Sequence, residues 1–149
     1  MDRFVDEFKP RPTDVAVCGS MAYKERWIEI IGKLRAEGLT VSAPDLSENS
    51  DWSAFSDEEV VRKKGWLIRR HFANIASAKV VLICNYDKND TKGYVGGNCF
   101  LEMGAAFVYG KPVFLLGGVP EQDNREEILA LEPVVLNGDL NGLIEEVKK

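Results

Sequence analysis

The sequence feature that most constrains the fold is an uninterrupted apolar run at residues 79–84, where Lys79 precedes Val-Val-Leu-Ile-Cys. A strand with one face in water alternates polar and apolar side chains, whereas a strand that helices cover on both faces is apolar throughout. The run therefore predicts a central strand of a parallel sheet. Parallel neighbours are joined by crossover connections, usually helices, so the rest of the chain should alternate between strands and helices.

The flanking sequence alternates in this way. Short apolar runs that predict further strands occupy residues 15–18, 39–43, 113–116 and 134–136. Apolar residues at helical spacing predict helices over residues 27–34, 56–76, 124–131 and 140–147, and another that contains Glu102. Ser56 and Glu59 form a capping-box pattern at the start of the second helix. This order predicts a single α/β domain of the flavodoxin-like (Rossmann-like) type, with a five-stranded parallel sheet of order 2-1-3-4-5 and helices on both faces.

Two stretches fall outside this alternation. Residues 1–13 contain two prolines and no sustained period, so we expect an N-terminal arm before a domain that spans residues 14–149. Residues 45–57 are polar, with Trp52 and Phe55 embedded among them. A loop of this length is typical of a lid or a binding loop.

Composition and charge exclude several classes of function. The net charge of −5 leaves no broad basic field for a nucleic-acid polymer, and we interpret the basic residues 62–64 and 69–70 as the solvated face of a helix. No apolar segment approaches the ~18 residues of a membrane helix, and the charged first ten residues do not resemble a secretory signal. We therefore expect a cytoplasmic protein. The three cysteines have wide spacings and no paired motif, so we expect reduced thiols, no metal site and no cofactor.

The predicted strand order places the binding site. The chain reverses direction between strands 1 and 3, and ligands bind beyond the carboxyl ends of those strands. The loops at this point contain the following candidate substrate-binding residues: Gly19, Ser20, Met21, Asn85, Gly93, Gly96 and Gly97. Glycines let the backbone approach a ligand closely, and N–H groups at a helix start can bind a phosphate or a sugar oxygen. Ser20 alone is equally well explained as a helix cap.

The helix after the second loop contains a lone carboxylate in apolar surroundings, within Leu-Glu-Met-Gly at residues 101–104. We expect Asn98 or Cys99 to start this helix, so Glu102 falls about one turn inside it. The positive helix end favours the ionised carboxylate, and poor solvation makes it a good nucleophile toward an electrophilic sugar carbon. The alternative is an ion pair between Glu102 and a lysine or arginine at the helix edge.

Four segments form a recognisable set: the Gly-Ser turn after the first strand, the glycine loop after the third, Phe100-Leu-Glu-Met-Gly-Ala-Ala106 and Gly110-Lys-Pro-Val113. Together they resemble the nucleoside 2-deoxyribosyltransferase family and its relatives that hydrolyse deoxynucleoside monophosphates. The likeness extends from about residue 14 to residue 143.

The resemblance implies a flavodoxin-like oligomer in which a glutamate at the position of Glu102 attacks C1′ of a deoxyribosyl group. The base leaves, and a covalent glycosyl-enzyme passes the sugar to a second base or to water. The resemblance also places Gly19 and Ser20 near the sugar or phosphate, and it implies substrate contacts for Tyr94 and Asn98.

Two positions depart from the family pattern. Many members carry an aspartate six residues before the nucleophile, where this chain has Gly96, and another on the helix before strand 3, where it has His71. A leaving base must be protonated or otherwise stabilised, and a histidine suits that role at neutral pH. A single histidine on a helix is more commonly structural. Asp87 and Asp90 are further candidates for the missing acid, with solvated loop acids as the alternative.

Three functions remain open at this point. The first is N-glycosidic bond cleavage or transfer on a small-molecule nucleoside or its monophosphate. The second is a catalytically silent module that binds a nucleotide or a nucleotide sugar. The third, ranked last, is a phosphoribohydrolase of the lysine-decarboxylase-like group, because residues 96–102 place Phe100 where that group has a threonine. Phe107, Val108 and Tyr109 suit an interface in a homo-oligomer.

Overall fold

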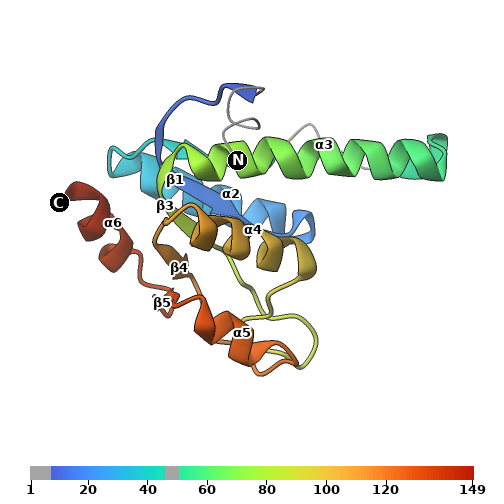
Figure 1. Ribbon diagram of the computed structural model, residues 1–149. Coiled ribbons are helices and arrows are strands. Elements are labelled where there is room, and N and C mark those ends of the chain that lie inside the picture. Colours follow the sequence, from blue (N-terminus) through green and yellow to red (C-terminus); the bar gives the residue numbers. More distant parts are fainter. Residues whose placement is uncertain (1–7, 46–50) are drawn as a thin grey trace.

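The computed structural model describes residues 8–45 and 51–149 (Figure 1). Most of the expected N-terminal arm and the centre of the loop at residues 45–57 lie outside the described residues. The elements, with η for a turn of 3-10 helix, are β1 (Thr13–Cys18), η1 (Met21–Tyr23), α2 (Lys24–Ala36), β2 (Val41–Ser42), η2 (Trp52–Ala54), α3 (Asp57–Ala76), β3 (Ala78–Ile83), α4 (Gly97–Val108), β4 (Val113–Leu115), α5 (Arg125–Ala130), β5 (Val134–Val135) and α6 (Asn141–Lys148).

The strands form one five-stranded parallel sheet of order β2-β1-β3-β4-β5, which confirms the predicted flavodoxin-like α/β fold. The apolar run that opened the sequence is the central strand, and five of the six residues of β3 are buried. β2 is shorter than the predicted strand over residues 39–43. The amide of Leu39 donates to the carbonyl of Leu34 at 3.2 Å, so Leu39 is held in the turn that follows α2.

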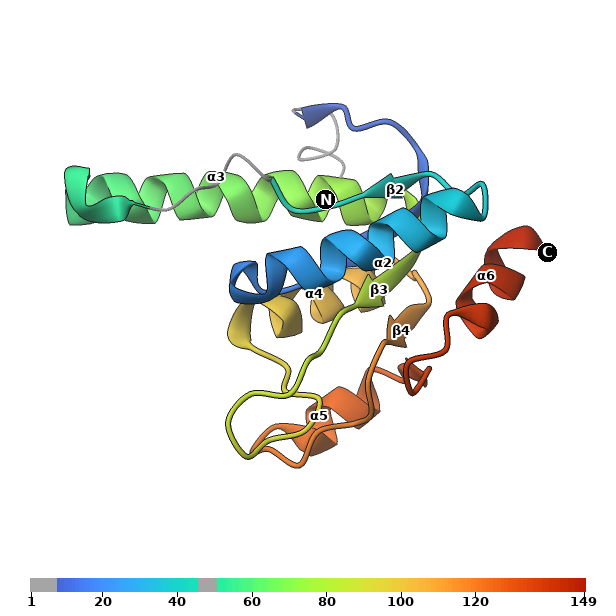
Figure 2. The ribbon, with the colours of Figure 1, turned by 180° about the vertical axis from the view of Figure 1, so that it is seen from behind.

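Helices cover both faces of the sheet, as Figure 1 and Figure 2 show from opposite sides. Successive side chains of a strand point to opposite faces. Val15 and Val17 of β1 therefore pack in the core beneath α2 and α6, while Ala16 and Cys18 pack in the core beneath α3, α4 and α5. The last residue of β1 thus points toward the two helices that supply His71 and Glu102.

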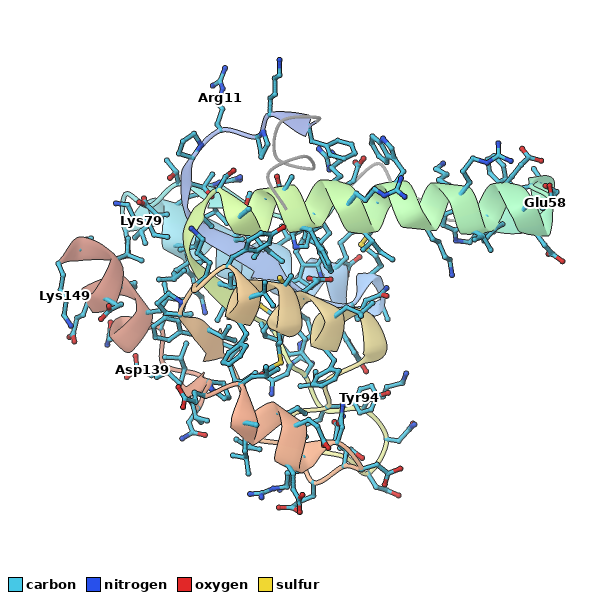
Figure 3. All side chains as sticks on the ribbon, in the orientation of Figure 1. Arg11, Glu58, Lys79, Tyr94, Asp139 and Lys149 are labelled. Atoms are coloured by element: carbon cyan, nitrogen blue, oxygen red, sulfur yellow. The ribbon has the colours of Figure 1, made fainter. Side chains whose placement is uncertain are left out.

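Helix α3 begins with the predicted capping box: Ser56 Oγ accepts from the Glu59 amide, and Glu59 Oε1 accepts from the Ser56 amide, each at 3.2 Å. Its N-terminal half extends well beyond the sheet, with Glu58 at the far end (Figure 3). Residues 62–64 are exposed on this half, as expected of a solvated face. The C-terminal half packs against the sheet, and it buries His71 with Ala73 and Ile75.

No helix in the described part of the chain is long and apolar enough to span a membrane.

Candidate functional site

The turn after β1 is held in shape by the indole ring of Trp27. A side chain at Gly19 would place its Cβ only 2.6 Å from Trp27 Cδ1, so this position accepts only glycine. The indole Nε1 also donates to the carbonyl of Ser20 at 2.9 Å. Ser20 Oγ accepts from the amide of Ala22 at 3.3 Å and caps η1, as the capping alternative predicted.

The loop after β3 is held by the buried side chain of Asn85. Its Nδ2 donates to the carbonyls of Gly93 and Gly118 at 2.9 and 2.8 Å, and its Oδ1 accepts from the amide of Gly117 at 2.8 Å. Gly93 has φ +64°, and a Cβ there would lie 2.8 Å from the Gly118 oxygen. Asn85 and Gly93 therefore join this loop to the segment after β4.

The predicted acids of this loop have different surroundings. Asp87 Oδ1 accepts from the amide of Gly93 at 2.8 Å, so this carboxylate stabilises the loop itself. Asp90 is exposed at the tip of a tight hairpin, which two 3.0 Å backbone hydrogen bonds between Lys88 and Thr91 close.

Helix α4 begins at Gly97, earlier than the expected start at Asn98 or Cys99, because Gly96 takes the extended conformation of a cap residue. Its side chain has no atoms to cap the helix, so the first N–H groups of α4 are available to an oxygen of a ligand. Glu102 follows on the same helix, more than one turn from its start.

A cavity of about 490 Å³ opens between these two loops and the helices α3 and α4. Seven of the nine predicted substrate-binding residues line it: Gly19, Ser20, Met21, Tyr94, Gly96, Gly97 and Asn98. His71 and Glu102 line it as well, whereas Asn85, Gly93, Asp87 and Asp90 are not among its lining residues. The fold therefore gathers most of the predicted site at one cavity and directs the remaining residues to loop structure.

His71 and Glu102 form the floor of the cavity, and with the fully buried Cys18 behind them they make a cluster of three functional groups from three elements. Nε2 of His71 lies 3.3 Å from Sγ of Cys18 and 3.3 Å from Oε2 of Glu102. The amide Nδ2 of Asn74 lies 3.3 Å from Nδ1 of His71, so the ring is held between Asn74 on one side and the other two groups on the other. Glu102 Oε2 is within ion-pair distance of the ring, but it is buried and accepts no hydrogen bond of good geometry from the described residues.

The floor is poorly solvated. The Cys18 side chain is fully buried, and this burial, followed by the charge of Glu102, raises the pKa of its thiol well above the usual range. Burial likewise raises the pKa of the Cys84 thiol to about 12 and that of the Cys99 thiol further still. The described cysteines are therefore protonated free thiols at neutral pH in the absence of a bound cation.

The mouth of the cavity was not predicted from the sequence. The other residues that line the cavity, at its mouth and along its walls, are Ala22, Tyr23, Pro44, Asp45, Trp52, Lys64, Leu67, Ile68, Arg70, Phe72, Cys84, Tyr86, Lys88, Cys99 and Leu101. Leu67, Ile68 and Phe72 are only partly buried because they border this opening. Arg70, predicted as part of a solvated face, lies 3.8 Å from Asp45 at the cavity. The sequence did contain one signal, because Leu67, Arg70 and His71 are spaced to share one face of a helix.

Aromatic rings and cations alternate around this mouth. The Arg26 guanidinium lies 3.9 Å above the ring of Tyr86, and Lys88 Nζ lies 5.2 Å from the ring of Tyr94. Tyr23 packs edge-on against Tyr86 at 5.6 Å, and its hydroxyl donates to the carbonyl of Asp87 at 3.2 Å. Flat rings with cations beside them are suited to a planar base and to anionic groups.

Comparison with known proteins identifies a similar fold. A solved structure of 2-deoxyribosyltransferase from the psychrotolerant bacterium Bacillus psychrosaccharolyticus superposes with a TM-score of 0.51 and is 19% identical in sequence. The match covers 68% of this chain and 70% of that chain, and at this identity it shows the fold alone. No family model matches the chain, and no curated protein sequence matches it significantly.

Proposed function

We propose that this protein cleaves or transfers the N-glycosidic bond of a nucleoside or its monophosphate, with Glu102 as the nucleophile. The proposal rests on the burial of the Glu102 carboxylate and on its lack of a hydrogen-bond donor among the described residues. Its side chain is 13% exposed, it lines the cavity, and its buried Oε2 accepts no hydrogen bond from the described residues. A carboxylate that the fold leaves unused at the floor of a ligand-sized cavity is suited to attack an electrophilic carbon.

In the proposed reaction a Glu102 oxygen attacks C1′ of the sugar as the bond from C1′ to the base nitrogen breaks. The electron pair of that bond leaves with the base, which takes up a proton, and an ester joins C1′ to Glu102. Water or a second base then attacks C1′ from the opposite side and releases the carboxylate. Two displacements return the sugar with its original configuration at C1′.

His71 has a positioning role in this proposal. Its Nε2 lies 3.3 Å from Glu102 Oε2, while Asn74 contacts the other ring nitrogen. The imidazole can hold the carboxylate in one orientation as charge moves from the oxygen to the sugar. The leaving base departs toward the mouth, where Tyr94 and Asn98 line the cavity.

The surroundings of Glu102 also favour a substrate with a planar base and an anionic group. Tyr86, Tyr94 and Trp52 supply rings on which a base can stack. Lys64 and Lys88 supply positive charge, and the uncapped N-terminus of α4 supplies N–H groups for a phosphate or sugar oxygen. We therefore propose a nucleoside monophosphate as the preferred substrate within the class.

We also propose that the protein forms a homo-oligomer. Phe107 and Val108, at the C-terminal end of α4, are neighbouring apolar side chains that are 52% and 67% exposed. Light scattering coupled to size-exclusion chromatography measures the assembly directly. A strictly monomeric protein at micromolar concentration would contradict this part of the proposal.

The proposal is tested by following base release from a panel of deoxyribo- and ribonucleosides and their 5′-monophosphates. Glu102→Gln keeps the shape of the side chain and removes the nucleophile, so it should lower turnover by about 10³-fold or more. Glu126→Gln, on the exposed face of α5, is the matched control and should leave turnover unchanged. Equal inactivity of the wild type and of Glu102→Gln on every substrate would overturn the proposal.

One observation favours a second candidate, a binding module that no longer reacts. The carboxylates that line the cavity are Glu102 and Asp45, and Asp45 lies beside Arg70, so no free acid is evident for the leaving base in the described chain. This candidate predicts thermal stabilisation by nucleotides without turnover.

The variant Gly96→Asp restores the aspartate that many members of the family carry at this position. The new Cβ would have one neighbour within 4 Å, Tyr94 Cε1 at 3.6 Å. Turnover that appears only in Gly96→Asp would favour the binding module, while wild-type turnover abolished by Glu102→Gln would exclude it.

A further inference from the structure

We propose that Cys18, His71 and Glu102 form a binding site for Zn²⁺ at the floor of the cavity. Within the described chain these are three potential ligands whose donor atoms all lie within 4.8 Å of one another. They come from β1, α3 and α4, three elements that pack together in one apolar core. Sequence spacing does not indicate this site, because the ligands are far apart along the chain and match no metal motif.

Two of the three donor separations match a tetrahedral zinc shell, and the third pair, Cys18 and Glu102, lies within 4.8 Å. Zinc bonds of about 2.3 Å to sulfur and about 2.0–2.1 Å to nitrogen or oxygen place neighbouring donor atoms about 3.3–3.6 Å apart. Here Nε2 of His71 lies 3.3 Å from Cys18 Sγ and 3.3 Å from Glu102 Oε2. Small side-chain adjustments are therefore sufficient to bring all three atoms to one ion.

The charges and the chemical character of the donors favour Zn²⁺. When zinc displaces the thiol proton, a thiolate and a carboxylate balance the two positive charges, and the imidazole is neutral. This removes an unpaired carboxylate charge from a site where solvation is poor. A thiolate with an imidazole selects a borderline or soft cation over Mg²⁺ or Ca²⁺, which prefer oxygen ligands.

A second residue is placed to hold the metal-binding form of the histidine. Asn74 lies 3.3 Å from Nδ1 of His71. A 180° rotation of its amide presents the oxygen to Nδ1–H and leaves Nε2 free to bind the ion. A hydrogen bond of this kind commonly fixes the tautomer and orientation of a ligating histidine.

The fourth coordination position would face the cavity, because both His71 and Glu102 line it. Three protein ligands with one open position describe a site that can bind water or an oxygen of a small molecule. One consequence rests on the proposed function: Glu102 cannot bind zinc and attack C1′ with the same oxygen. Zinc should therefore inhibit base release competitively with substrate.

The site is tested by metal binding in the absence of substrate, so that the result does not depend on turnover. The full chain is stripped with a chelator and titrated with Co²⁺, whose thiolate charge-transfer absorption reports sulfur coordination, and then with Zn²⁺ to displace the cobalt. One equivalent of Co²⁺ with that absorption is the expected result for the wild type. Absence of the band in a folded protein would overturn the proposal.

Two cysteine variants separate this site from non-specific binding to a thiol. Cys18→Ser should abolish the thiolate band, while Cys99→Ser should retain it, although Cys99 is also buried and free and lies on the wall of the same cavity. Equal binding by wild type and Cys18→Ser, or an equal loss in both variants, would contradict the assignment.

Two further measurements remain decisive if Cys18→Ser does not fold. X-ray absorption of the zinc-loaded wild type should show one sulfur and at least two nitrogen or oxygen neighbours, and a shell without sulfur would overturn the site. Asn74→Ala should lower zinc affinity by about 10-fold through the loss of the partner of Nδ1. An unchanged zinc affinity in Asn74→Ala would exclude that residue from the site.

Discussion

The cavity floor and the loop after β3 both contain carboxylates that the sequence marks as candidate catalytic groups. The two regions differ in whether these carboxylates already accept hydrogen bonds. Glu102 projects from a helix onto the floor, and its Oε2 accepts no hydrogen bond from the described residues. Asp87, in the loop, accepts the amide of Gly93 at 2.8 Å. A carboxylate is available for chemistry when the surrounding backbone does not already use it, and this difference separates the two regions.

The largest change is expected at the floor, where His71→Ala should lower turnover by about 100-fold through loss of the orientation of Glu102. Binding should change little, so the effect should appear in kcat and not in KM. His71→Gln, which can place an amide near the position of Nε2, should recover part of the lost rate. Steady-state kinetics on the best substrate from the panel measures all three proteins. A matching loss in both variants, confined to KM, would show that His71 serves only binding.

In the loop the largest expected effect is on stability. Asn85→Ala removes a buried side chain that joins Gly93, Gly117 and Gly118, and it leaves their polar groups without partners. We expect a loss of about 2 kcal/mol in the free energy of unfolding. Urea denaturation of the variant and the wild type measures it. A stability within about 0.5 kcal/mol of the wild type would show that water replaces these contacts.

A smaller loss is expected for Asp87→Ala, about 1 kcal/mol, because one hydrogen bond to the Gly93 amide is removed at an exposed position. The same denaturation experiment applies. If Asp87 is the missing acid, turnover should instead fall far more than stability. That outcome would overturn the distinction between the floor and the loop.

The smallest effect belongs to Asp90→Asn. This side chain is exposed at the hairpin tip and is not among the residues that line the cavity. Both unfolding free energy and turnover should match the wild type within error, about 0.5 kcal/mol for stability. A tenfold fall in turnover would place Asp90 in the site and require movement of the hairpin toward the cavity.

The sheet was predictable because its signals are local. The apolar run at residues 79–84, the capping box at Ser56 and the turn signals between elements each depend on nearby residues, and they agree with one another. The first and last residues of the strands and helices were less predictable. A local hydrogen bond between Leu39 and Leu34 delayed the start of β2, and the extended conformation of Gly96 moved the start of α4. Glycine-rich loops at the switch point correctly indicated where the cavity opens, since strand order alone determines that position.

What the sequence by itself determined is the fold, the edge of the sheet that carries the cavity, and a carboxylate on the helix that borders it. Only the tertiary structure decided which functional groups lie next to that carboxylate. Cys18, His71 and Glu102 come together because β1 ends beneath the crossing of α3 and α4, which no spacing along the chain records. Asn85 became a loop support for the same reason, since its long-range contacts to Gly117 and Gly118 decide that its polar groups are already satisfied.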